Sequence, residues 1–164
     1  MIITKGKISD INDVFVMIDQ AKEFLKEQNI NQWQDNYPNI NTITEDIELE
    51  RLYVVKENDL VIGIFVVVEY EPTYDVIYDG SWYDNSSYIA VHRIAVLNDY
   101  KGKGVANCIF NYLKHKYNHI RVDTHRNNLN MQRCLIKNNF KYCGIIYLNK
   151  NSESDKERLA YEYF

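Results

Sequence analysis

The chain has 164 residues, enough for one domain with a sizeable core, and 46% of them are hydrophobic and 26% charged. The 19 basic residues against 23 acidic ones give a net charge of −4. This balance argues against a nucleic-acid partner, because such proteins usually present a basic face. It is compatible with a cationic substrate such as an amine. We therefore expect a single domain over residues 1–164.

No segment has the pattern of an export signal or a membrane span. The start, Met1–Gly6, lacks a basic stretch followed by an apolar run. The longest apolar run, Leu60–Val68, is far shorter than the roughly 20 residues of a spanning helix. Cys108, Cys134 and Cys143 are odd in number and lack the paired spacing of metal ligands. We expect a cytoplasmic protein with reduced thiols, no metal site and no membrane partner.

The first half of the chain predicts a short strand, two helices joined by a polar linker, and a hairpin. Ser9 and Asp10 can cap the first helix, and Thr42 or Thr44 the second. We expect these elements, in chain order, at Ile2–Lys7, Ile11–Leu25, Thr44–Glu50, Leu52–Lys56 and Leu60–Tyr70, with the linker at Gln28–Asn41 and the hairpin turn at Glu57–Asp59.

The second half alternates strands and helices after an acidic, aromatic insertion. Asn127 or Asn128 can cap the later helix. A strand–helix–strand order implies one parallel crossover inside a hairpin-rich sheet, and so an α/β or α+β domain. We expect the insertion at Glu71–Ser87, strands at Tyr88–Val96, His119–Thr124, Lys141–Leu148 and Arg158–Phe164, and helices over Val105–Lys116 and around Met131–Leu135.

The segment Lys101–Ala106 follows a strand and opens a helix. The first turn of a helix has free N–H groups and the positive end of the dipole, so it favours anionic oxygens. Gly102 and Gly104 let the backbone approach such an anion closely, and two lysines add positive charge. The glycine spacing matches neither the Rossmann nor the Walker pattern. Alone, the segment indicates either an anion site or a flexible basic turn.

With its flanks, this segment resembles motif A of the GNAT superfamily of acyl-CoA N-acyltransferases. The family pattern is Arg/Gln-x-x-Gly-x-Gly/Ala, and Lys101, Gly104 and Ala106 match it with one conservative departure. Asn128–Phe140 is similar to the second cofactor segment of the family, with Asn139 in place of a glycine. The resemblance implies a mixed, mostly antiparallel sheet with splayed parallel strands four and five, flanked by about four helices.

The resemblance also implies acetyl-CoA as the co-substrate, held between strands four and five. The backbone of the fourth strand would pair with the pantetheine arm, the glycine turn would hold the pyrophosphate, and an asparagine would bind from the far side. The residues implied are Ile94, Ala95 and Val96 for the arm, Lys101, Gly102, Lys103, Gly104, Val105 and Ala106 for the pyrophosphate, and Asn128 for the far side.

A base or a water chain must take the proton of the amine. Asp123 occupies the position that carries a catalytic Glu in the similar ribosomal-protein alanine acetyltransferases, although it could instead anchor neighbouring backbone. His92 and His125 are alternative bases, since imidazole titrates near neutrality. If the fifth strand continues to His125, strand alternation allows Asp123 and His125 to form a pair.

Many relatives protonate the leaving thiolate with a Tyr in the second segment, where this chain has Leu135. Tyr142, Tyr147 or Cys134 could replace it, or the thiolate could leave unaided. The departure keeps a non-catalytic acyl-CoA-binding sensor or structural module as an alternative function, and nucleotide binding by the glycine turn as a further one.

The acceptor side is expected in the linker and at the end of the third strand. Trp33, Tyr37 and Glu69 would line it, because carboxylate and aromatic groups suit an alkylammonium ion. The alternative is a solvated loop with aromatics packed on the core. The resemblance therefore implies acetyl transfer to a primary amine of a small molecule or peptide by direct attack in a ternary complex. The oligomeric state stays open, with a homodimer as one expectation.

Overall fold

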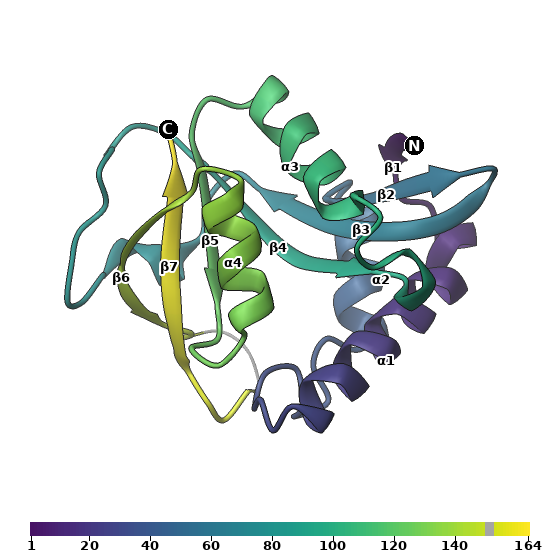
Figure 1. The fold of residues 1–164 in the computed structure, drawn as a ribbon, viewed down its shortest axis with the longest axis horizontal. Helices are drawn as coiled ribbons and strands as arrows, with labels where there is room; N and C mark the ends of the chain where they lie inside the picture. The colour runs from purple at the N-terminus through teal and green to yellow at the C-terminus, as the bar shows by residue number, and fades with distance from the viewer. Residues whose placement is uncertain (150–152) are drawn as a thin grey trace.

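The computed structural model describes residues 1–149 and 153–164. Within this part, seven strands form one sheet in the order β1-β2-β3-β4-β5-β7-β6 (Figure 1). The strands are β1 (Ile2–Lys5), β2 (Leu52–Glu57), β3 (Leu60–Val68), β4 (Ile89–Val96), β5 (Ile120–Thr124), β6 (Lys141–Tyr147) and β7 (Glu157–Tyr163). The helices are α1 (Ile11–Glu27), α2 (Ile40–Glu48), α3 (Val105–Lys116) and α4 (Leu129–Lys137).

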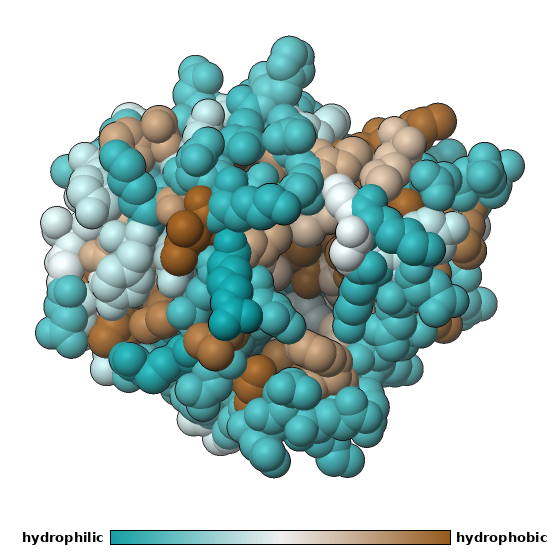
Figure 2. Space-filling view, viewed as in Figure 1, coloured by the Kyte–Doolittle hydropathy of each residue, from teal (hydrophilic) through white to brown (hydrophobic). Residues whose placement is uncertain are grey.

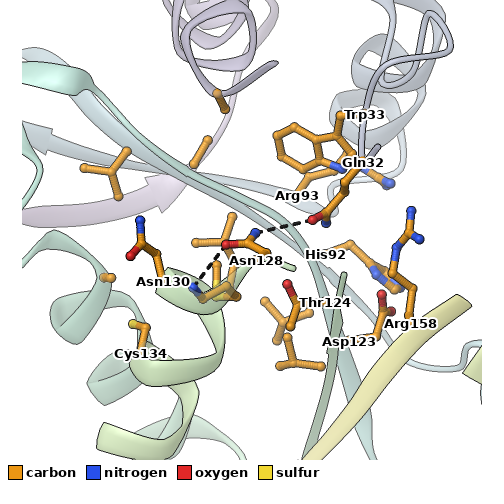
Figure 3. A pocket seen from close by; sticks show the side chains of 18 of the residues that line it. Gln32, Trp33, His92, Arg93, Asp123, Thr124, Asn128, Asn130, Cys134 and Arg158 are labelled. Atoms are coloured by element: carbon orange, nitrogen blue, oxygen red, sulfur yellow. Dashed lines mark hydrogen bonds between the residues drawn. The ribbon is translucent and has the colours of Figure 1, made fainter. Parts of the chain in front are cut away.

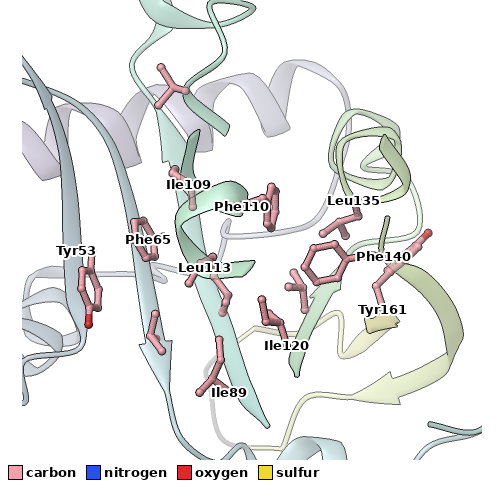
Figure 4. Packing of buried hydrophobic residues seen from close by; sticks show 14 of the residues in the cluster. Tyr53, Phe65, Ile89, Ile109, Phe110, Leu113, Ile120, Leu135, Phe140 and Tyr161 are labelled. Atoms are coloured by element: carbon pink, nitrogen blue, oxygen red, sulfur yellow. The ribbon is translucent and has the colours of Figure 1, made fainter. Parts of the chain in front are cut away.

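Helices cover both faces of the sheet because the side chains of the central strands alternate between two apolar clusters. On β2, Tyr53 and Val55 join the cluster that contains the buried residues of α3 and α4. Leu52 and Val54 join the cluster formed with α1 and α2. Figure 4 shows the first cluster, in which aromatic and branched side chains from α3, α4 and the strands interlock. The mixed α/β fold with flanking helices is confirmed.

Strands β4 and β5 are the parallel neighbours of the sheet described here, and they pair only at their beginnings. The register joins Ile89 to Ile120 and Ala90 to Arg121, and no later pair follows in the described ladder. Figure 1 shows the two strands separating beyond this point. The expected splay of strands four and five is confirmed.

A β-bulge distorts β4 just after its paired part. The register with β3 shifts between Ile64 and Val66, which face Ala95 and His92, so β4 carries one extra residue there. Arg93 takes a left-handed φ of 51° in the bulge. The extra residue changes which way the side chains of β4 point at the start of the gap.

The insertion between β3 and β4 is fixed against the sheet by a buried charge. Glu162 on β7 is fully buried and lies 2.6 Å from His119 Nε2 and 3.2 Å from Arg121 Nε. The N–H of Tyr83 in the insertion also donates to Glu162, at 2.7 Å. A buried carboxylate needs such partners, so this network holds the insertion in place.

Several predicted boundaries were wrong. Helix α2 begins at Ile40 rather than Thr44, because the side chain of Asn39, and not Thr42 or Thr44, accepts the N–H groups of Asn41 and Thr42. The first strand ends at Lys5, since Lys7 already caps a 3₁₀ turn, Ile8–Asp10. The later strands also differ from the prediction by one or two residues at their ends.

Two local predictions were right. Asn128 caps α4 by accepting the N–H of Met131 at 3.2 Å. Asn139 takes the left-handed conformation, with φ of 67°, where the family has glycine. No helix in residues 1–149 and 153–164 has the length and apolar character needed to cross a bilayer.

We predict that Leu113→Ala destabilises the protein by roughly 2–5 kcal/mol, because it leaves a cavity among fully buried neighbours. Leu129→Ala is the matched control, since Leu129 is 54% exposed and should change stability by at most about 0.5 kcal/mol. Urea denaturation of both variants measures the difference. Equal losses in the two variants would contradict the placement of Leu113 in the core.

Candidate active site

A cavity of about 1180 Å³ opens where β4 and β5 diverge. Figure 2 shows this face hollowed near its centre, with apolar atoms in the depth of the hollow and polar side chains around it. The volume exceeds that of typical small-ligand sites, roughly 300–1,000 Å³, and suits an elongated ligand with a second molecule. The lining comes from β4 and β5, from α1, α2 and the loop after α1, from the turn before α3 and the start of α4, and from the beginning of the insertion and the start of β7.

One end of the cavity is the glycine turn before α3. Gly104 is the N-cap of α3 with a φ of 86°, and no side chain caps the helix there. Gly102 has a φ of 77°, and a Cβ added at either glycine would meet nothing within 4 Å. The first N–H groups of α3 therefore face open space, which is the geometry that binds anionic oxygens.

Basic side chains surround this end. Lys101 lines the cavity, and burial lowers its pKa although Glu27 opposes the effect. Arg133 and Lys137, one turn apart on α4, line it from the other side. Lys103 lies outside the lining, with its ammonium 5.1 Å from the centre of the Tyr100 ring. Val105 and Ala106 also line the cavity.

The edge of β4 forms the middle of the cavity. Ile94, Ala95 and Val96 all line it. They lie beyond the two residue pairs that join β4 to β5, so this edge has no strand partner among the described residues. Free peptide groups on a strand edge can pair with an extended ligand that carries amide groups.

Asn128 links the start of α4 to the loop after α1. Besides capping α4, its side-chain amide donates to Gln32 Oε1 at 3.3 Å (Figure 3). Gln32 belongs to the loop after α1. The structure therefore places Asn128 at the cavity, with its oxygen and its amide both occupied by protein groups.

Asp123 lies at the far end of the cavity and accepts a hydrogen bond from Tyr74 at 2.6 Å. Tyr74 is 1% exposed. Burial first, and then the charge of Asp123, raise the pKa of Tyr74 well above its usual value, so the phenol keeps its proton and donates. Asp123 thus keeps one oxygen available to the cavity.

His92 lies at the same end, with Nε2 3.1 Å from Glu71 Oε2. Burial would raise the pKa of Glu71, but the hydrogen bond and charge of His92 and the N–H of Thr73 outweigh it and lower the pKa to about 2. Glu71 is therefore ionised at neutral pH and orients the imidazole. A base held by a carboxylate is a common arrangement for proton transfer.

The loop after α1 closes this end. Arg93 pairs with Asp46 through two hydrogen bonds of 2.7 and 2.8 Å and donates to Tyr37 Oη at 2.6 Å. The N–H of Trp33 donates to Glu153 Oε1 at 2.5 Å. Tyr37 and Trp33 line the cavity. Glu69 is exposed and lies outside the lining, whereas Glu71 lines the cavity.

Most of the other predicted proton-transfer groups lie outside the cavity. The Asp123–His125 pair does not form, because β5 ends at Thr124 and His125 Nε2 lies 2.8 Å from Asp155. Leu135 is buried in the core beneath α4. Tyr142 and Tyr147 are exposed outside the cavity, whereas Cys134 lines it, with a pKa raised by burial.

The sequence analysis did not assign roles to the groups that support this end of the cavity. Glu71 and Tyr74 come from the insertion, whose one sequence signal is its density of acidic and aromatic residues. Glu153 precedes β7 and Arg158 lies on it, and neither belongs to a motif. Among the described residues, no group of three or more His, Cys, Asp or Glu side chains could hold a metal ion.

Comparison with known proteins gives structural matches. A GNAT-family acetyltransferase from Streptococcus agalactiae is 32% identical, with a TM-score of 0.90, over 99% of this chain and 94% of that one. A candidate acetyltransferase from Staphylococcus aureus is 26% identical, with a TM-score of 0.69, over 99% and 97%. A ribosomal-protein-alanine N-acetyltransferase from Brucella melitensis, 11% identical over 100% and 99% with a TM-score of 0.64, shares the fold alone. No protein-family model and no curated protein matches.

We predict that the carboxylate of Glu71 stabilises the protein at neutral pH. Its pKa lies below the ordinary 4.5, so the stabilisation is present above about pH 4.5 and is lost as the pH falls towards about 2. The stability advantage of the wild type over Glu71→Gln should shrink by about 2 kcal/mol between about pH 5.5 and about pH 3, which denaturation at the two pH values measures. The exposed Glu69→Gln is the control, and an equal change there would contradict the assignment.

Proposed function

Because the chain belongs to the GNAT family of acetyltransferases, we propose that it transfers an acetyl group from acetyl-CoA to a primary amine of a small molecule or peptide, by direct attack in a ternary complex. The observation that carries the proposal is one continuous cavity. It joins the uncapped first turn of α3 to a carboxylate and an imidazole at its other end.

The residues of the cavity fit a CoA-like molecule. Lys101, Gly102 and Gly104 would hold the pyrophosphate with the first N–H groups of α3, and the open space above both glycines leaves room for its oxygens. The free edge of Ile94–Val96 would pair with the amides of the pantetheine arm. When bound, acetyl-CoA supplies a thioester carbon to which the amine nitrogen bonds while the carbon–sulfur bond breaks, releasing the CoA thiol.

The far end of the cavity would bind and deprotonate the acceptor. The Asp123 carboxylate attracts an ammonium group and orients it, since one of its oxygens is already fixed by Tyr74. His92, held by Glu71, takes the proton that makes the nitrogen nucleophilic. The second proton released by the nitrogen balances the one gained by the departing sulfur.

A non-catalytic acyl-CoA-binding module is the second candidate. The buried Leu135 supports it, because that position offers no acid to the leaving thiolate. Protection against heat by acetyl-CoA, without thiol release for any amine of a broad panel, would favour the module over the enzyme.

We predict that Lys101→Ala raises the KM for acetyl-CoA about tenfold and changes kcat by less than about twofold, because it removes a uniform contact to a phosphate group. Thiol release with a saturating amine measures both constants. Lys26→Ala, in the last turn of α1, is the matched control and should leave both unchanged. An unchanged KM in Lys101→Ala would place the pyrophosphate elsewhere.

We predict that His92→Gln lowers kcat by about 10²- to 10⁴-fold near pH 7, because glutamine can still contact Glu71 but cannot take the proton. Part of the loss should be recovered at high pH, where more of the amine is neutral. His115→Gln, an exposed histidine of α3, is the control. Near-normal turnover in His92→Gln together with inactivity of Asp123→Asn would identify Asp123 as the base instead.

A further inference from the structure

A buried cation lies at the acceptor end of the cavity with unused hydrogen-bonding capacity. Arg158 on β7 is 1% exposed and lines the cavity. Its Nη1 donates to the carbonyls of Asp155 and Glu157, at 2.9 and 2.7 Å. Its Nη2 has no hydrogen-bond acceptor among residues 1–149 and 153–164, which is rare for a buried guanidinium.

The sheet places this guanidinium beside Asp123. The register joins Asp123 of β5 to Ala160 of β7. Arg158 is two residues from Ala160, and because side chains alternate along a strand, it lies on the same face as Asp123. Figure 3 shows Arg158, Asp123 and His92 together at this end of the cavity.

Glu153 is the nearest carboxylate to Arg158, with Oε1 3.1 Å from Nη2, but outside hydrogen-bond geometry. The same oxygen accepts the N–H of Trp33 at 2.5 Å, which fixes Glu153 to the loop after α1. Burial raises the pKa of Glu153 and outweighs the opposing effects of the Trp33 N–H and of Arg158, while the charge of Asp123 adds to the rise. Glu153 therefore lies within ion-pair distance of Arg158 and still leaves Nη2 without a well-directed hydrogen bond.

Arg93, which lines the same cavity, has no such capacity. It uses Nε and Nη2 on Asp46 and Nη1 on Tyr37. Arg158 Nη2 differs from it in having a free direction for a further anion. An acceptor that carried only positive charge would gain from Asp123 and leave Arg158 Nη2 without an acceptor, whereas an acceptor with both signs would satisfy both groups.

From this juxtaposition we propose that the acceptor is an amine that also carries a carboxylate, as a free amino acid does, with Asp123 binding its ammonium and Arg158 Nη2 its carboxylate. The inference rests on the proposed acetyl transfer and specifies its substrate class. Asp123 would bring the nitrogen towards His92, and Arg158 would act as a binding residue that selects the substrate without taking part in proton transfer.

The test compares each amino acid with its carboxamide and with its decarboxylated amine, which keep the amine and remove the negative charge. Thiol release from acetyl-CoA gives kcat and KM for each acceptor. In the wild type, kcat/KM should be about 10- to 100-fold higher for the amino acid than for the carboxamide or the decarboxylated amine. The difference should lie mainly in KM, as expected for a charge-assisted hydrogen bond. Equal use of the three compounds would overturn the inference and leave the acetyl transfer intact.

Variants locate the effect. Arg158→Lys should reduce the preference and keep part of it. Arg158→Met should abolish it, so that the kcat/KM values of the amino acid and of the decarboxylated amine come within about threefold of each other in that variant. Arg126→Lys and Arg126→Met are matched controls, because Arg126 is an exposed arginine paired with Glu157, outside the cavity lining. If Arg158→Met does not fold, the proposal is tested by Arg158→Lys and by the comparison of the three acceptors in the wild type.

A binding measurement separates this inference from the proposed function. Calorimetry with CoA present compares an N-acetyl amino acid with its amide. Tighter binding of the acid by about tenfold or more, reduced in Arg158→Lys, supports the carboxylate site even if no amine is acetylated. Equal binding of acid and amide would overturn it. Absence of thiol release with every amine would overturn only the acetyl transfer.

Discussion

Strands β4 and β5 are held together at two residue pairs, Ile89 with Ile120 and Ala90 with Arg121, and then separate. A parallel pair that continued would satisfy its peptide groups in a ladder and leave no space between the strands. The separation instead leaves the edge of Ile94–Val96 free and opens a cavity through the sheet. The glycine turn, the acceptor end and the start of α4 all line that cavity, so the candidate site depends on this local failure to pair.

Charged groups at the acceptor end are held in pairs, and these pairs also assemble the chain. Glu71 orients His92, Tyr74 fixes Asp123, and the two residues that provide this support come from the insertion after β3. Glu162 anchors the same insertion to β5 and β7. Since buried charges are costly without partners, the network that stabilises the insertion also positions the groups assigned to proton transfer.

The two ends of the cavity carry different electrostatic character, which suits two different ligands. The turn before α3 presents free N–H groups and Lys101, a combination that favours phosphate oxygens. The acceptor end presents both Asp123 and the guanidinium of Arg158 within a closed region beneath the loop after α1. A single cavity can therefore hold an anionic co-substrate and a smaller acceptor side by side, as direct transfer requires.

The sequence by itself determined the parts of the protein that are local. Hydrophobic period placed the strands and helices, and the anion-binding turn was recognisable because its glycines and helix start are contiguous. Asn139 could be read as a left-handed position for the same reason. These features depend on backbone geometry within a few residues, so the residues adjacent in sequence are sufficient to specify them.

Only the tertiary structure decided the acceptor end. Trp33 lies 120 residues before Glu153, and no periodicity or motif connects it with Glu153 and Arg158. The expected pair of Asp123 with His125 failed because β5 ends one residue earlier and His125 turns to Asp155. Glu69 lies outside the cavity because β3 ends at Val68. Two residues after Glu69, Glu71 contacts His92 inside it. Which charges meet is fixed by long-range packing, and sequence spacing contains no information about that.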